Sequence, residues 1–166
     1  MNLFLPEKTV YDSVRALDDK RLIKQILECK TILDVALDES KKGYAKHPVV
    51  KYYSVFPNFV ATYGYIATIE YYTRFKKDHS LQGHFCKYVG EIQKKILVDA
   101  MLRGKNLSYY PKPFYCEGSK TDPNCIRTTE NTVELFRNKL CKKWDNDKYP
   151  PKWTNRQPPE WYKNKR

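Results

Sequence analysis

Apolar residues recur at steps of three and four through most of the first hundred residues, which is the spacing of amphipathic helices. The clearest row predicts one long helix that includes residues 15–30 and ends near residue 42, with apolar positions at Leu22, Ile26, Cys29, Leu33 and Leu37. The same spacing predicts a second, polar stripe on this helix, formed by Asp18, Arg21, Lys24, Gln25 and Glu28.

Further helices follow along the chain. After the loop "GYAKH", Pro48 stands at the first position of a short helix that Pro57 closes. Asn58 is the expected N-cap of the next helix, "NFVATYGYIATIEYYTRFKK", and a third main helix is expected over roughly residues 84–103. No segment shows a convincing strand pattern, so the predicted fold class is all-α.

The composition changes at residue 105. The segment that follows is rich in proline and aromatic residues, "TVELFRNKLCKKW" predicts one more helix, and the Pro-Pro pairs of "KYPPKWTNRQPPEWYKNKR" exclude regular helix or central strand there. We therefore expect a single domain over 1–166, with three or four main helices packed as a compact bundle. Residues 1–104 would form its helical core, and 105–166 an irregular C-terminal wrap with one helix and a basic aromatic tail.

The net charge of the chain predicts the kind of molecule that it binds. The chain has 31 Lys and Arg against 19 Asp and Glu, a formal charge of +12, which predicts a polyanionic partner, with nucleic acid as the first candidate. The apolar stretches are short and interrupted by charges, and "MNLFLPEKTV" lacks the features of a signal peptide. We expect an intracellular protein that does not bind membranes, and a monomer.

The cysteines give no metal signature. All five are scattered without CxxC spacing, which favours reduced thiols. Cys116 and Cys125 bracket a turn-rich segment and could be linked by oxidation or by a metal, with His84 and Cys86 as further ligands. A structural zinc site normally needs four convergent ligands at tighter spacing, so no metal and no cofactor is predicted. Phosphate-binding loops and nucleophile motifs are also missing.

Glu28 is the main candidate for chemistry, although a charged helix face is usually just solvated. A carboxylate flanked by Arg21 and Lys24 should stay ionised, so that it could stabilise a cationic sugar intermediate or carry protons beside a phosphate backbone. Spacing by itself does not choose between these two interpretations.

Several segments resemble one family. "LDDKRLIKQILE" is similar to the first-helix segment of the phage pyrimidine dimer DNA glycosylases, the endonuclease V type with AP lyase activity, and the catalytic glutamate of that segment falls on Glu28. "GYAKHP" resembles a Gly-Tyr-x-x-His-Pro loop of the cellular branch, and "HPVVKYYSVFPNFV" with "IATIEYYTRF" resembles its next helix pair. The resemblance covers residues 1 to about 104 and implies an almost wholly helical fold.

The resemblance also implies a mechanism in which the N-terminal α-amine attacks the sugar carbon and Glu28 is the general acid and base. Such an amine has an ordinary pKa of about 7.7 to 8, so part of it is unprotonated at neutral pH. Two departures stand out. Asn2 is bulky and should prevent removal of the initiator methionine, so either Met1 itself supplies the amine or the imine chemistry is absent. Leu27 stands where the phage enzyme has an arginine.

The predicted DNA contacts come from the cationic stripe, the loop histidine and the tail, whose "PPEWYKNKR" resembles the aromatic, basic C-terminus of the phage enzymes. For two of these regions a structural alternative stays open, since the histidine could cap the Pro48 helix and the tryptophans could fill the core. The predicted contact residues are Asn2, Lys20, Arg21, Lys24, His47, Lys51, Trp153, Arg156, Trp161 and Tyr162.

The predicted function is a phage-encoded DNA glycosylase with AP lyase activity on a damaged or modified pyrimidine base, which is flipped out of the duplex and processed in the host cytoplasm. Two alternatives remain. One is a phage base-modifying enzyme that holds a co-substrate with the C-terminal third, and the other is a non-catalytic protein that binds DNA or RNA.

Overall fold

The computed structural model describes residues 3–37, 43–54, 56–90 and 130–164. Residues 82–90 are helical there, and no strand occurs in these ranges, so the all-α prediction is confirmed. The other described helices are α1 (Val10–Ala16), α2 (Asp19–Leu37), α3 (Pro48–Ser54), α4 (Pro57–Phe75), α6 (Glu130–Asp145) and α7 (Glu160–Lys163).

Helix α1 ends at Ala16 and α2 begins at Asp19, so the prediction of one helix across residues 15–30 is wrong. Leu17 has extended backbone angles, φ −69° and ψ 143°, and the carbonyl of Asp18 accepts the first helical hydrogen bond of α2, from Leu22 N–H at 2.9 Å. Two adjacent carboxylates favour a helix start at this point, because negative charge is stabilised beside the unpaired N–H groups of a helix N-terminus. The expected end near residue 42 lies outside the described residues.

Two prolines delimit the next helices. Pro48 is the first residue of α3, as predicted. Pro57, however, begins α4 instead of closing α3, and Phe56 is the N-cap, so the expected N-cap at Asn58 is wrong. Proline is favoured at a first helical position because the N–H that it lacks would have no partner there.

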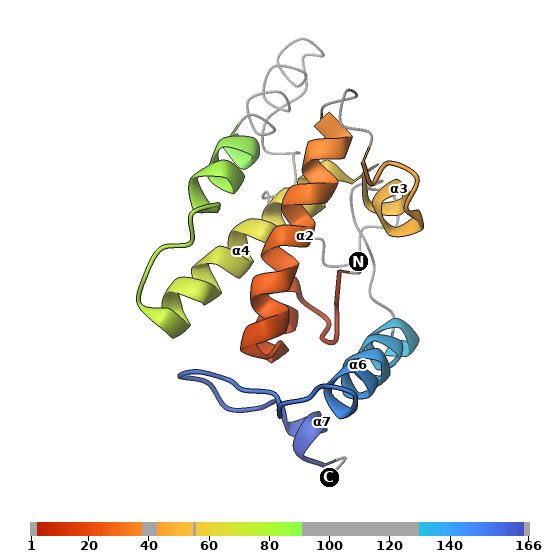
Figure 1. Cartoon of the computed structure of the whole chain (residues 1–166), viewed down its shortest axis with the longest axis vertical. Helices are drawn as coiled ribbons and strands as arrows, with labels where there is room; N and C mark the ends of the chain where they lie inside the picture. The colour runs from red at the N-terminus through yellow and green to blue at the C-terminus, as the bar shows by residue number, and fades with distance from the viewer. Residues whose placement is uncertain (1–2, 38–42, 55, 91–129, 165–166) are drawn as a thin grey trace, which may run out of the picture.

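The core lies where α2 crosses α4 (Figure 1). The predicted apolar row of α2 is buried at Leu22, Ile26, Cys29 and Leu33, while Leu37 is exposed. The described part of the helix expected over residues 84–103 packs against α4 through Phe85, and the remainder lies outside the described residues.

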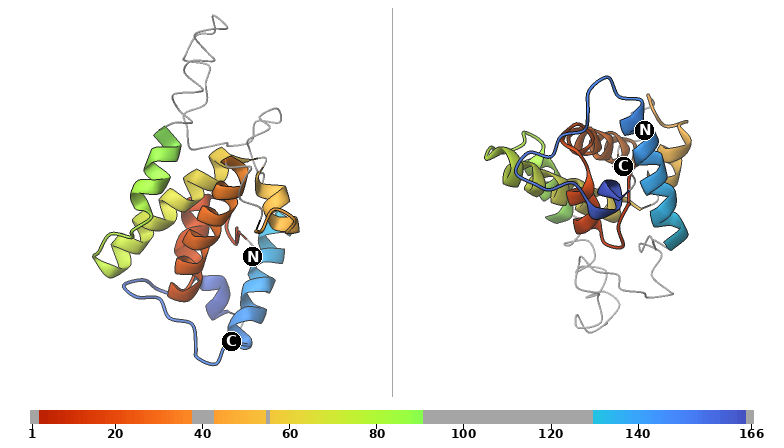
Figure 2. Two further views of the ribbon diagram at one scale, coloured as in Figure 1. Left: turned by 45° about the horizontal axis from the view of Figure 1, so that its top comes forward. Right: turned by 90° about the horizontal axis from the view of Figure 1, so that it is seen from below.

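Helix α6 confirms the predicted C-terminal helix, and it buries Val133, Phe136, Leu140 and Trp144. The C-terminal segment, residues 146–164, crosses the lower end of the molecule (Figure 2). It is mostly irregular, but α7 shows that the exclusion of helix from the tail is wrong for four residues. None of the described helices is long and apolar enough to cross a membrane.

Candidate functional site

Glu28 lies in the wall of a pocket of about 570 Å³, and its exposed fraction is 7%. Arg21 and Gln25, on the same stripe of α2, are 6% and 1% exposed. The stripe is therefore not a solvated helix face. The lining residues come from the chain start, the first half of α2 and the end of α6: Phe4, Lys20, Arg21, Lys24, Gln25, Glu28, Lys142, Lys143, Asn146 and Asp147.

Positive charge dominates this pocket. Lys20 and Lys24 of α2 and Lys142 and Lys143 of α6 are exposed, whereas Arg21 is buried. These side chains outnumber the two carboxylates that share the lining, and a concave surface with such a charge balance attracts phosphate groups. The pocket can thus hold a polyanion beside a carboxylate.

Asp147 pairs with two of these cations. Its carboxylate accepts hydrogen bonds from Arg21 and from Lys20, the latter at 2.9 Å. These bonds hold the pKa of Asp147 well below its usual range. Arg21 also donates to the carbonyl of Lys143 at 3.3 Å, which ties the end of α6 to α2.

The start of the described chain lies beside Glu28. Gln25 Nε2 donates to Glu28 Oε2 at 2.8 Å, and Gln25 Oε1 accepts from Phe4 N–H at 2.8 Å. In Figure 1 this red segment runs along α2 on the side of α6. Met1 and Asn2, which the sequence predicts to be functional, lie outside the described residues.

Helix α3 does not contribute to the pocket. His47 Nδ1 accepts from Val49 N–H at 3.2 Å, so its side chain caps the first turn of α3, which is the structural alternative considered above. Lys51 is exposed one turn further on. Neither residue lines the pocket, and their contact with DNA stays a prediction.

The aromatic tail residues predicted to contact DNA pack against the core, with Tyr162 buried and Trp153 and Trp161 partly buried. Trp144 of α6 contacts Trp153, Trp161 and Tyr162, with ring centroids 4.7 to 5.7 Å apart. Trp153 Nε1 also donates to the carbonyl of Ala16 at 3.1 Å. This packing corresponds to the core-filling alternative, and stacking on bases remains an untested prediction.

Arg156 is held in an ion pair. It donates to both carboxylate oxygens of Glu70, at 2.8 and 2.9 Å, and the buried Arg74 donates to the same carboxylate at 2.8 Å. Burial alone would raise the pKa of Glu70, but the hydrogen bonds from the two arginines lower it below its usual value. To contact DNA, Arg156 would have to leave this ion pair or bind Glu70 and a phosphate at the same time.

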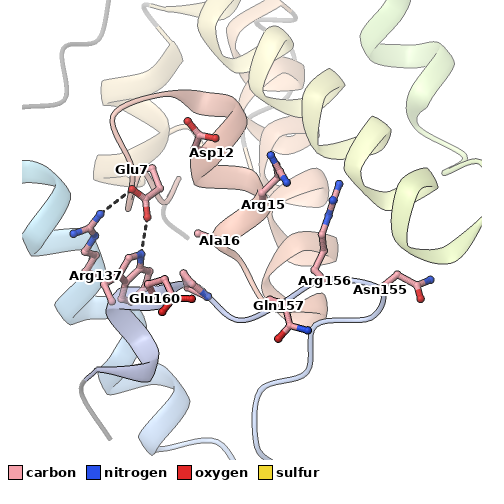
Figure 3. A pocket seen from close by; sticks show the side chains of 11 residues that line it. Glu7, Asp12, Arg15, Ala16, Arg137, Asn155, Arg156, Gln157 and Glu160 are labelled. Carbon is pink, nitrogen blue, oxygen red and sulfur yellow. Dashed lines mark hydrogen bonds and ion pairs between the residues drawn. The ribbon is translucent and has the colours of Figure 1, made fainter.

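A second pocket, of about 1100 Å³, lies between α1, α6 and the tail. It is lined by both signs of charge: Figure 3 shows Glu7 joined to Arg137, and Arg15 and Arg156 also line the pocket. Glu7 also accepts from Trp161 Nε1 at 2.6 Å. Glu28 is not part of this pocket, so the cationic pocket is the candidate site.

Sequence reasoning missed the contribution of α6. Lys142 and Lys143 stand in the last turn of α6 and Asp147 follows it, and none of them was predicted from the sequence to have a role in the site. The adjacent lysines were the visible signal, but the packing of α6 beside α2 is what makes them part of the pocket.

No group of three or more His, Cys, Asp or Glu side chains able to hold a metal occurs in the ranges that the structure describes. Cys29, Cys86 and Cys141 form no disulfide, whereas Cys116 and Cys125 lie outside those ranges. His84 lies 3.8 Å from Asp34, measured from Nε2 to Oδ1.

Comparison with known proteins identifies a family for the first half of the chain. A family model described as pyrimidine dimer DNA glycosylase matches residues 1–83. No significant match was found among the curated proteins or among the solved structures. The resemblance inferred from the sequence is thereby confirmed over α1 to α4, the part of the chain that contains Glu28 and the α2 side of the pocket.

Proposed function

The chain belongs to the pyrimidine dimer DNA glycosylase family, and from this premise we propose that it excises a damaged or modified pyrimidine from duplex DNA and then cleaves the strand at the resulting abasic sugar. The observation that carries the proposal is the position of Glu28 in the wall of a cationic pocket, next to the residue that binds the chain start. The working unit would be a monomer, and the likeness to phage enzymes favours a phage gene.

The pocket supports DNA binding from two sides. Lys20 and Lys24 approach from α2, and Lys142 and Lys143 approach from α6. Each phosphate contact releases condensed counterions, so binding should weaken as salt rises. A base can reach a buried carboxylate such as Glu28 only after it leaves the helical stack, which supports base flipping.

The proposed chemistry begins with the α-amine of Met1. The unprotonated amine attacks C1′ of the sugar, the glycosidic bond breaks, and its electron pair leaves with the base, which takes up a proton. Loss of a proton from the attacking nitrogen and opening of the sugar ring give an imine. Removal of a proton from C2′ then expels the 3′ phosphate, and water hydrolyses the imine. Glu28 would carry the protons in these steps.

Covalent geometry allows the amine to reach Glu28. Met1 precedes Phe4 by three residues, and an extended chain spans at most about 3.6 Å per residue. The amine is thus confined to within roughly 11 Å of Phe4 N, which is hydrogen-bonded to the side chain that also binds Glu28.

Borohydride trapping tests this proposal. Duplexes with a pyrimidine dimer or an abasic site are incubated with the protein and reductant, and the adduct is mapped by mass spectrometry. We expect a covalent adduct at Met1 with the native chain and its loss in Glu28→Gln. Glu134→Gln provides the matched control, because Glu134 is exposed on α6 and does not line the pocket. No adduct with either duplex would overturn the imine mechanism.

A non-catalytic DNA-binding protein is the second candidate. Leu27, beside Glu28 in the sequence, is 51% exposed where the resembled enzymes have an arginine, so this chain lacks one cation at the site. Strand cleavage separates the two functions, since a binding protein would retain affinity for lesion-containing duplex and leave both strands intact.

A further inference from the structure

The chain start is held by side chains rather than by secondary structure. Leu3 and Phe4 are 0% and 4% exposed and belong to no helix. Phe4 N–H donates to Gln25 Oε1, Tyr63 Oη donates to the carbonyl of Phe4 at 2.8 Å, and Tyr53 Oη lies 3.5 Å from the carbonyl of Leu3. Buried backbone groups need such partners, because an unpaired one loses its hydration without compensation.

Gln25 uses both ends of its amide in this network. Its Oε1 accepts from Phe4 N–H at 2.8 Å and lies 3.3 Å from Tyr63 Oη. Its Nε2 donates to Glu28 Oε2 at 2.8 Å. A backbone N–H can only donate, so the oxygen of the amide must face Phe4, and the nitrogen consequently faces the carboxylate.

We propose that Gln25 is a positioning residue that couples the chain start to Glu28. The inference deepens the proposed function and rests on it. The Gln25 amide on α2 orients the Glu28 carboxylate, which moves protons, and holds the chain start, which carries the amine. Both reacting groups are thereby directed to the same sugar. A misplacement of about 1 Å between reacting groups can lower a rate by about a hundredfold, which gives such a residue a large effect without contact with DNA.

The coupling can be measured without activity. In Glu28→Gln the amide at position 28 replaces a charged acceptor of Gln25 with a weaker neutral one, so the anchor of Phe4 should loosen. We expect hydrogen exchange of the Phe4 amide, followed by NMR, to become at least about threefold faster, and Glu134→Gln to leave it unchanged. Equal Phe4 exchange in both variants would overturn the coupling even if the protein proves to be an active glycosylase.

The catalytic consequence is tested by comparing two side chains, Gln25 of α2 and Tyr63 of α4, that both bond the backbone of Phe4. Gln25→Met keeps the side-chain length and removes both hydrogen bonds, whereas Gln25→Glu keeps an acceptor for Phe4 N–H and loses the donor to Glu28. Tyr63→Phe is the matched control, because it removes the hydroxyl contacts with the Phe4 carbonyl and with Gln25 Oε1. It leaves the bonds of Gln25 to Phe4 N–H and to Glu28 in place.

We expect both Gln25 variants to lower kcat for strand cleavage at saturating DNA by at least about tenfold, and Tyr63→Phe by less than about threefold. The added charge of Gln25→Glu should raise KM, so kcat is the decisive quantity for that variant. If Tyr63→Phe lowers kcat as much as the Gln25 variants do, Gln25 only helps to hold the chain start in place. The same conclusion follows if the Gln25 variants change only the melting temperature. If the native chain forms no adduct and cuts no strand, the proposed function fails, whereas Phe4 exchange still decides the coupling.

Discussion

Replacing Asp147 by asparagine should tighten DNA binding. Asp147 lines the cationic pocket and accepts hydrogen bonds from Lys20 and Arg21, two of the side chains expected to neutralise phosphate. Its carboxylate therefore occupies a position that suits a phosphate oxygen and repels the DNA backbone. Asparagine keeps the shape and one acceptor oxygen, so the substitution mainly removes the negative charge.

Coulomb's law sets the size of the effect. A carboxylate about 7 Å from a phosphate charge repels it by roughly 0.6 kcal/mol in a dielectric like that of water, and by about 2.4 kcal/mol at an effective dielectric constant of about 20. Its removal should tighten binding by about threefold to fiftyfold at low salt. If Lys20 and Arg21 each gain a phosphate contact, the slope of log affinity against log salt steepens by up to about 1.8.

Fluorescence anisotropy with a labelled duplex, repeated across a series of salt concentrations, measures both quantities. Asp145→Asn is the control, because Asp145 is exposed at the end of α6, does not line the pocket, and gives the same change in net charge. Thermal unfolding should accompany the titration, since Asp147 also ties the buried Arg21 to the end of α6. Equal affinities for the two variants, or weaker binding of folded Asp147→Asn, would refute a local repulsion in the pocket.

Three further outcomes are expected. Lys24→Ala should weaken duplex binding and reduce the salt slope by about 0.9 without changing thermal unfolding, because this lysine lines the pocket and is exposed; an unchanged slope would remove it from the DNA surface. Glu70→Gln should be less stable than the native chain above about pH 5, because the lowered pKa of Glu70 means that its charged form stabilises the fold. This contribution is lost as the pH falls below 4.5, the ordinary pKa of the group, so the difference in unfolding free energy between the two proteins should shrink there. Chemical unfolding measures that difference, and a constant value across the pH range would contradict the prediction. Gly64→Ala should destabilise the protein by about 1 to 3 kcal/mol, because an added Cβ would overlap the ring of Phe85. Gly83→Ala, with no atom within 4 Å of its Cβ, is the control, and equal melting temperatures of the two variants would contradict this packing.

Local sequence patterns were sufficient for features that depend on near neighbours. The apolar row of α2, the start of α3 at Pro48 and helix α6 were all predicted, because helical periodicity and proline geometry act over a few residues. Family membership was also visible in short segments of the first half, and Glu28 was identified as a candidate from that likeness.

Predictions from local patterns were wrong where contacts with residues distant in the sequence determine the backbone conformation. Residues 15–30 contain no proline or glycine that would end a helix. However, Asp18 accepts from Trp144 Nε1 at 2.7 Å and Asp19 from Arg74 at 3.0 Å, and these contacts fit the helix break at Leu17. Their partners are 126 and 55 residues away in the sequence. No window along the chain contains that information.

The candidate site shows the same division. The sequence by itself determined that Arg21, Lys24, Gln25 and Glu28 share one stripe of a helix, since side-chain direction follows from helical geometry. Only the tertiary structure decided that Arg21, Gln25 and Glu28 are buried while Lys24 is exposed. It also decided that α6 supplies lysines to the pocket and that Gln25 joins Glu28 to Phe4. Burial and hydrogen bonding depend on which segments meet in space, and these contacts cross more of the chain than any local periodicity can specify.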